Sequence, residues 1–119
     1  MITNEDFSID ALVEKMKRPE LGGIVTFLGT VRGDAGVTAL HVEIYKEMAE
    51  QELEKLKREA REKFEIEAVE IVHREGELNV GENIVAILVG AKHRKEAFRA
   101  CEYLIDELKK RVPIWKKEG

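Results

Sequence analysis

Lysines near the C-terminus are the clearest candidates for chemistry in this chain of 119 residues. Lys109 falls in the last turn of a predicted helix. Lys116 follows Ile114 and Trp115, whose bulk should anchor a strand-like tail to the body. A lysine held against apolar surface loses hydration, which lowers its pKa and frees the amine to act as a base or a nucleophile. Taken alone, the pattern favours a plainer interpretation, a basic tail, because cations at a helix C-terminus complement the helix dipole.

Two further basic clusters could bind an anion. Residues 29–33 (Gly-Thr-Val-Arg-Gly) follow a predicted buried strand, and Arg32 there could grip a phosphate or a carboxylate with two hydrogen bonds. By its spacing alone, Arg32 fits a solvated arginine beside a turn better. Lys92, His93 and Arg94 lie at the predicted start of the last helix, where backbone N–H groups bind anions. That start could also be plain surface, but a bound anion would relieve its unfavourable positive charge.

The remaining polar candidates are weaker. His41 and His73 lie in predicted strands and are expected to be packing or surface residues, and Cys101 is expected in the core. No Cys/His cluster has the spacing of a zinc site, and no pair of carboxylates has a diagnostic spacing. Gly76 and Gly81 do not form a phosphate-binding motif. We therefore expect no metal and no cofactor.

Composition bounds the class of protein. The length fits one domain, residues 1–119, and charged residues make up 37% of a chain with a net charge of −4. A mildly acidic chain argues against non-specific binding of nucleic acid. The single cysteine predicts a reducing, cytoplasmic setting. Residues 1–6 lack the features of a signal peptide, and no apolar run reaches the roughly 20 residues of a membrane span.

The elements that would position these residues follow from hydrophobic periodicity and helix caps. Ser8 is a predicted N-cap, and the last helix should face the core with Phe98, Cys101, Ile105 and Leu108. The predicted helices cover about 9–17, 47–64 and 93–110; the predicted strands cover 2–7, 24–28, 40–45, 66–74 and 84–89, with a loop between Gly76 and Gly81. This order predicts an α+β fold, a two-layer sandwich with a mostly antiparallel or mixed sheet covered by about three helices.

Four segments of the chain together resemble one known family. Residues 22–32, 72–78, 91–94 and 108–118 are similar, in order and spacing, to the large, catalytic subunit of molybdopterin synthase. Four motifs in register over nearly the whole chain are far more specific than any one of them.

The resemblance implies a role in the biosynthesis of the molybdenum cofactor. Members of the family convert cyclic pyranopterin monophosphate (precursor Z) to molybdopterin by installing two dithiolene sulfurs. The sulfur arrives as a thiocarboxylate on the C-terminal Gly-Gly of a small ubiquitin-like subunit, whose tail inserts into the large subunit. The implied assembly is a homodimer of large subunits within a heterotetramer.

The resemblance also implies roles for single residues. The family's essential lysine falls on Lys109, and its second active-site lysine falls on Lys116. Its pterin-phosphate pocket falls on Arg32, His93 and Arg94, with Thr30, Val31, Lys117 and Glu118 at the edge. In dimeric relatives the arginine that corresponds to Arg32 can reach a site in the neighbouring subunit. Relatives often continue past the segment that ends at Glu118, so pocket residues from such an extension would have no counterpart here.

Two other classes of function compete with this interpretation. A non-catalytic α+β module could use the same basic pocket only to dock a ubiquitin-like partner or an anionic ligand. A nucleic-acid-binding domain is the second alternative, but the acidic balance and the low aromatic content of 6% argue against stacking platforms for bases.

Overall fold

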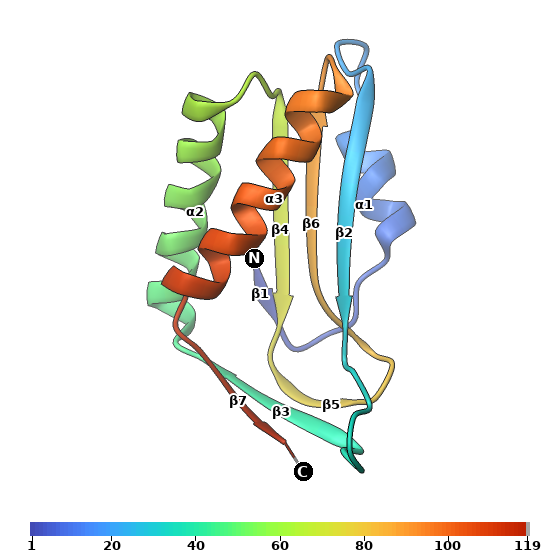
Figure 1. Cartoon of the computed structure of the whole chain (residues 1–119), viewed down its shortest axis with the longest axis vertical. Helices are drawn as coiled ribbons and strands as arrows, with labels where there is room; N and C mark the ends of the chain where they lie inside the picture. The colour runs from blue at the N-terminus through green and yellow to red at the C-terminus, as the bar shows by residue number, and fades with distance from the viewer. Residues whose placement is uncertain (119) are drawn as a thin grey trace.

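The computed structural model describes residues 1–118, and its largest element is a four-stranded sheet (Figure 1). The strand order is β1-β4-β6-β2. β1 pairs with β4 in parallel, and the other neighbours are antiparallel. The strands are β1 (Ile2–Thr3), β2 (Gly23–Thr30), β4 (Ala68–Arg74) and β6 (Asn83–Ala91). β2 therefore forms one edge of this sheet, and β6 lies inside it, which suits its largely apolar sequence.

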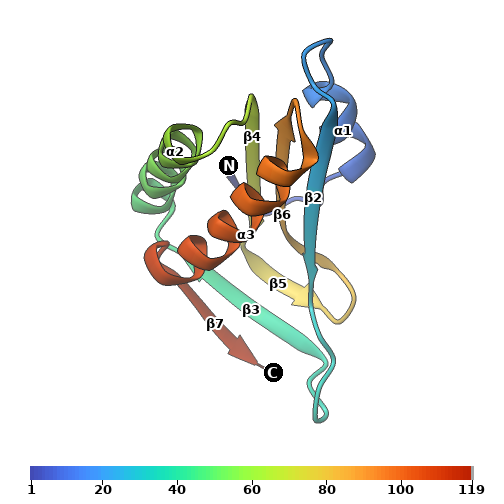
Figure 2. The ribbon, with the colours of Figure 1, turned by 45° about the horizontal axis from the view of Figure 1, so that its top comes forward.

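A second sheet of three strands closes one end of the molecule (Figure 2). It contains β3 (Ala39–Ile44), β5 (Gly76–Asn79) and β7 (Ile114–Glu118), in the order β5-β3-β7. Both of its pairings are antiparallel, so the C-terminal strand β7 is an edge strand beside β3. The inner side chains of this sheet join the ends of β2 and β6 in a small apolar cluster around Val31, Val42, Leu78 and Ile84.

In the part of the chain that the structure describes, three helices cover the four-stranded sheet. α2 (Lys46–Lys63) and α3 (Arg94–Arg111) pack on one face over the main core, and α1 (Ile9–Met16) packs on the other (Figure 1). The predicted cap of α1 is confirmed, because Ser8 Oγ accepts a hydrogen bond from the Ala11 N–H at 3.2 Å. Within residues 1–118 no helix is both long and apolar enough to cross a membrane.

Ion pairs tie α2 to α3. The Arg111 guanidinium donates two hydrogen bonds to Glu59, at 2.8 and 2.7 Å, and also lies within 3.4 Å of Glu52. The hydrogen bonds from Arg111 lower the pKa of Glu59 to about 2. The carboxylate therefore stays charged down to strongly acidic pH, and the two helices remain joined just before the chain enters β7.

The predicted α+β class is confirmed, and the strands divide between two sheets. The predicted strand over residues 2–7 is too long, since only Ile2 and Thr3 pair, and Thr3 Oγ1 then accepts the Glu5 N–H in a local turn. The predicted loop after Gly76 is wrong, because residues 76–79 form β5. Its Leu78 is 1% exposed, and the φ of +101° at Gly76 supplies the bend that precedes this strand.

Two aromatic residues also differ from expectation. Phe98 does not face the core; its side chain is 60% exposed, because α3 rests on the sheet through the smaller Ala97, Ala100 and Cys101. Trp115 does not anchor the tail to the body. It is 55% exposed, and the half-buried Ile114 packs against the core instead. Strand alternation explains this, because consecutive residues of β7 point to opposite faces.

Candidate active site

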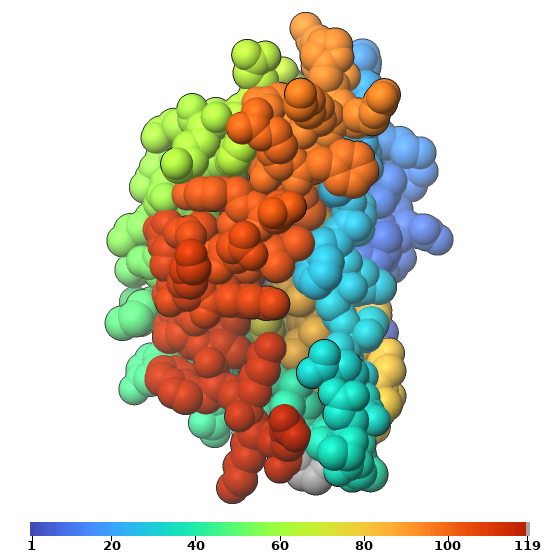
Figure 3. Space-filling model, in the orientation of Figure 1, coloured from blue at the N-terminus to red at the C-terminus, as the bar shows by residue number. Residues whose placement is uncertain are grey.

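A cavity of about 450 Å³ lies where the two sheets meet below the end of α3. Figure 3 shows the C-terminal segment and the segment after β2 lying on either side of this part of the molecule. The volume is that of a small-molecule site. Three cationic side chains face two carboxylates in its wall, and the rest is largely apolar. The lining residues are Phe27, Gly29, Thr30, Val31, Arg32, Asp34, Val37, Leu40, Ile84, Val85, Lys109, Lys116 and Glu118.

Lys116 reaches this cavity from the edge strand β7. It pairs with Val42 of β3, whose side chain is 1% exposed, so alternation places Lys116 on the inner face of the sheet. The side chain keeps contact with solvent, yet the surrounding protein removes part of its hydration and lowers the pKa of its amine. The positive charge of Lys109 lowers that pKa further. The predicted direction of the shift is therefore confirmed, although Trp115 is not its cause.

Lys109 comes to the same cavity from the last turn of α3. The neighbouring Leu108 is buried. The last hydrogen bond of the helix is donated by the Val112 N–H to the carbonyl oxygen of Leu108, at 3.1 Å. Val112 is extended, as expected before Pro113, so the chain turns at once into β7. This short connection brings Lys109 and Lys116 to one cavity, although seven positions separate them in the sequence.

The third cation of the cavity comes from the segment that follows β2. Val31 is buried, and its backbone bonds to Gly81 and Glu82, which fixes the end of β2 beside β6. Thr30 and Arg32 flank Val31 and line the cavity. The exposed Arg32 guanidinium forms an ion pair with Asp34, a cavity residue that sequence reasoning missed. Only the turn composition of residues 33–36 hinted that the chain folds back here.

The last two residues of the predicted pocket divide between the faces of β7. Glu118 pairs with Leu40 and lines the cavity. Lys117 pairs with His41 on the opposite face, where both residues line a separate hollow of about 380 Å³ with Glu77. In the single chain, Lys117 therefore lies outside the cavity that contains Lys116.

His93 and Arg94 lie at the other end of α3. His93 is the N-cap residue, and both side chains are exposed. Arg94 and Lys109 are fifteen positions apart, which at 1.5 Å per helical residue is about 22 Å. Within residues 1–118, no carboxylate lies at ion-pair distance from either side chain, so this helix start keeps its positive charge unpaired. The single chain does not bring these two residues to the cavity.

His73 lies behind the cavity wall, and sequence reasoning did not place it there. It is 2% exposed, pairs with the cavity residue Val85, and its Nδ1 lies 2.8 Å from the carbonyl oxygen of Arg74. Burial lowers the pKa of His73 to about 4, and the nearby Lys116 adds to this shift. The imidazole is therefore neutral near pH 7, so it adds no further positive charge beside the cations of the cavity.

The geometry defines a class of protein: a small α+β domain with a lysine-containing cavity suited to an anionic substrate. Comparison with known proteins gives the family. The family model described as "MoaE protein" matches residues 2–111. The molybdopterin synthase catalytic subunit of Pyrococcus abyssi is 48% identical over 117 residues, which cover 96% of this chain and 79% of the relative. The chain belongs to the MoaE protein family.

Solved structures agree with this assignment. A Staphylococcus aureus molybdopterin synthase chain superposes with a TM-score of 0.93 and 39% identity, covering 99% of this chain and 88% of the other. A Helicobacter pylori chain has a TM-score of 0.86 and shares the fold at 23% identity, covering 98% of this chain and 82% of the other. It was solved as a complex of subunits 1 and 2 of molybdopterin-converting factor.

Proposed function

We propose that this chain is the catalytic subunit of a molybdopterin synthase, which transfers sulfur from a small-subunit thiocarboxylate to precursor Z. The observation that carries the proposal is the meeting of Lys109, Lys116 and Arg32 in one cavity, from three separate elements. Both substrates of this reaction are anionic, and a cationic cavity binds such groups and stabilises negative charge that develops during transfer. The lone Cys101 fits a cytoplasmic site of action.

The cavity supports separate roles for its cations. Lys109 holds the acyl end of the thiocarboxylate and stabilises the oxyanion that forms when the acyl carbon is attacked. Lys116, whose pKa is lowered, exchanges a proton with the reacting groups more readily than an ordinary lysine. Arg32 binds the substrate phosphate after leaving its ion pair with Asp34. Thr30, Val31 and Glu118 shape the wall around these groups.

The distant pair His93 and Arg94 completes the site in a homodimer. β2 is a free edge of the four-stranded sheet, and a second copy can pair with it in antiparallel fashion about a two-fold axis. The Gly22 N–H donates to the carbonyl oxygen of Ala91 at 3.0 Å, so the start of β2 lies beside the residues that lead into α3. Antiparallel pairing brings the partner's start of β2 to the Thr30 end of this copy. The start of α3 in the partner then lies next to the cavity.

The proposed dimer accounts for the unpaired positive charge at the start of α3 and for the position of that charge relative to the partner's cavity. The helix start at His93 and Arg94 has no anionic partner among residues 1–118, and the cavity needs further groups to hold a phosphate. The apolar side chains near the free edge would be covered in the same contact. Leu28 on β2 and Phe98 on α3 are 39% and 60% exposed in the single chain.

The small subunit is the second partner in this proposal. The Helicobacter pylori structure supports it, because that related fold was solved in complex with another subunit of its converting factor. The proposed assembly is a heterotetramer, in which two copies of this chain form the centre and each binds one ubiquitin-like sulfur carrier by its C-terminal tail.

The decisive experiment mixes this chain with a thiocarboxylated small subunit and precursor Z, and measures the dithiolene product. We expect product with the wild-type chain and at least a hundredfold lower rate with Lys109→Ala, since one preorganised donor contributes about 10²–10³. Lys110→Ala, an exposed lysine of the same helix turn, is the matched control. Product formation by Lys109→Ala at the wild-type rate would instead make this chain a docking module without catalytic lysines.

A further inference from the structure

One residue in the wall of the active-site cavity, Gly29, has no side chain. It lies near the end of β2 and pairs with Val85 of β6. Glycine in a strand costs stability, because it loses more chain entropy on folding than other residues do and packs no side chain. The backbone does not require it, since the φ of Gly29 lies outside the positive range. The reason for glycine at this position therefore lies in the space around its Cα.

A side chain at position 29 would collide with Val85. A Cβ atom added there would lie 2.7 Å from Cγ1 of Val85, whereas Phe27 Cε2 and Ile84 Cγ2 would be 3.4 and 3.5 Å away. A distance under 3.0 Å forces a neighbour to move. Val85 has few alternatives, because a β-branched side chain is stiff at χ1. All of these residues line the cavity, so a displaced Val85 would change the shape of its apolar wall.

The apolar wall is the part of the cavity that carries no charge. Phe27, Ile84 and Val85 contribute only carbon atoms from their side chains, while Lys109 and Lys116 line the same cavity with cations. A planar ring gains affinity on an apolar wall through dispersion and the release of hydration water, and a few polar groups orient it. Precursor Z combines a pterin ring with a phosphate. The cations therefore suit its phosphate, and the apolar wall suits its ring.

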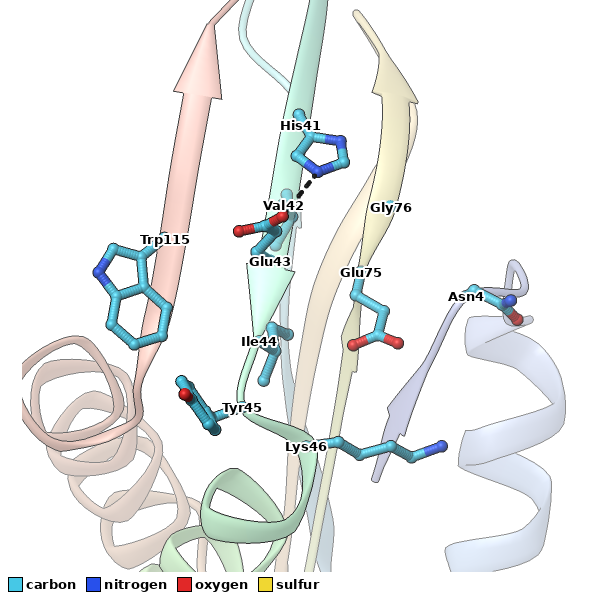
Figure 4. A pocket seen from close by; sticks show the side chains of 10 residues that line it. All are labelled: Asn4, His41, Val42, Glu43, Ile44, Tyr45, Lys46, Glu75, Gly76 and Trp115. Carbon is cyan, nitrogen blue, oxygen red and sulfur yellow. Dashed lines mark ion pairs between the residues drawn. The ribbon is translucent and has the colours of Figure 1, made fainter.

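The larger groove on the outer face of the three-stranded sheet does not suit this substrate. Figure 4 shows Trp115 and Tyr45 on one side of that groove, which has a volume of about 580 Å³. Two carboxylates, Glu43 and Glu75, line it together with a single lysine, Lys46. Like charges repel, so this groove disfavours an anionic pterin, and the ring belongs in the active-site cavity.

We propose that Gly29 determines which substrates the cavity accepts, because its missing side chain lets Val85 lie against β2 and keeps the apolar wall open for a flat ring. This inference rests on the proposed function, and it assigns the apolar wall to the pterin ring. Gly29 acts through Val85 and not on the reacting atoms. A side chain at position 29 therefore weakens the binding of the ring and leaves the binding of phosphate unchanged.

Binding of precursor Z to the chain without its small subunit tests this inference, since no sulfur donor is then present and nothing reacts. We expect calorimetry to give a dissociation constant at least about tenfold higher for Gly29→Ala than for wild type, because one methylene group in an apolar pocket changes recognition by about 10–200-fold. The inhibition constant of inorganic phosphate, measured by competition, should stay the same. Gly29→Ala combined with Val85→Ala should recover most of the affinity for precursor Z, because the colliding Cγ1 is absent.

Gly90→Ala is the matched control for strain in the fold. A Cβ atom added at Gly90 of β6 would also lie 2.7 Å from a side-chain atom, Cδ1 of Leu21, but neither residue lines the cavity. We expect this variant to bind precursor Z like wild type, whatever stability it loses in thermal unfolding. If Gly29→Ala does not fold, Val85→Ile takes its place. That variant adds a methyl group to the same wall with Gly29 kept, and it should also raise the dissociation constant.

Four results would overturn the role of Gly29 and leave the proposed function intact. They are wild-type affinity for precursor Z in Gly29→Ala (or in Val85→Ile where it takes its place), an equal loss of phosphate binding, an equal loss of precursor Z binding in Gly90→Ala, and no recovery in the double variant. A wild-type chain that binds no precursor Z would overturn the proposed function, and the role of Gly29 with it.

Discussion

Lys116 shows how the position of a residue changes its pKa. Its amine loses hydration at the cavity and lies close enough to Lys109 for repulsion to lower its pKa below the ordinary value of 10.5. We expect Lys109→Ala to raise the pKa of Lys116, because the mutation removes one of the two causes. Titration of the Lys116 side chain by NMR measures this directly. Lys110→Ala should leave the value unchanged, and an equal shift in both variants would contradict a specific coupling between the two lysines.

His73 makes a different residue-scale prediction, on the pH dependence of stability. The pKa of His73 is about 4 in the folded chain and 6.5 when unperturbed. Between these two pH values, His73 binds a proton in the unfolded chain but not in the folded chain. Stability is therefore lost as the pH falls from 6.5 towards 4. From these two values the loss due to His73 is about 3 kcal/mol between pH 7 and pH 4.

Urea unfolding of wild type and His73→Leu at pH 7, 5 and 4 tests this. We expect the stability of the wild-type chain to fall more steeply than that of the variant, since carboxylates contribute equally to both. Parallel pH profiles would show that the buried imidazole is protonated in the folded state.

At the scale of elements, α3 links the core to the site. Leu104 in its buried stripe is 0% exposed, and Lys109 follows five positions later. Leu104→Ala should destabilise the fold by about 2–5 kcal/mol, because it removes buried methyl groups and leaves a cavity. Glu102→Ala on the exposed side of the same helix is the control and should change stability by less than about 0.5 kcal/mol. Chemical denaturation measures both, and equal effects would mean that α3 is not anchored through Leu104.

Helices and strands are predicted well where a single hydrophobic periodicity dominates the segment. The helix over 47–64, the cap of α1 and the strand over 84–89 depend on neighbours close in the sequence, and each is confirmed. Phe98 and Trp115 are misplaced because apolarity alone predicts burial, whereas both lie on surfaces that only another molecule could cover. β5 is missed because its four residues are specified by pairing with β3, a contact distant in the sequence.

At the scale of the whole molecule, the cavity depends on contacts that no local pattern encodes. Periodicity places Lys109 at a helix end and Arg32 after a strand, but only the crossing of the two sheets brings them together. Asp34 enters the cavity through a turn that folds back, and His73 lies behind it through strand register. The resemblance to a family predicts a role for the two lysines, yet a single chain leaves Arg94 about 22 Å from Lys109 along α3.

The proposed dimer makes a prediction that a single-chain site cannot share. Lys109→Ala and Arg94→Ala should each abolish most activity when alone, because one removes the cavity lysine and the other removes the cation donated to the partner's cavity. Mixing and reassembling the two variants in equal amounts should restore activity. Half of the dimers then contain one chain of each kind. In each of these one site has both defects, and the other combines intact Lys109 with intact Arg94, so about a quarter of all sites are active.

The rate of dithiolene formation after denaturation and joint refolding measures this recovery, and separate refolding of each variant gives the baseline. Lys109→Ala mixed with Lys116→Ala is the matched control. Both residues line the same cavity of one chain, so each hybrid dimer still has one defect in every site and no activity should return. No recovery with Arg94→Ala would place Arg94 and Lys109 in a single-chain site and exclude pairing through β2 as the reason for their charge. Recovery in the control would instead mean that Lys109 and Lys116 serve sites in different chains.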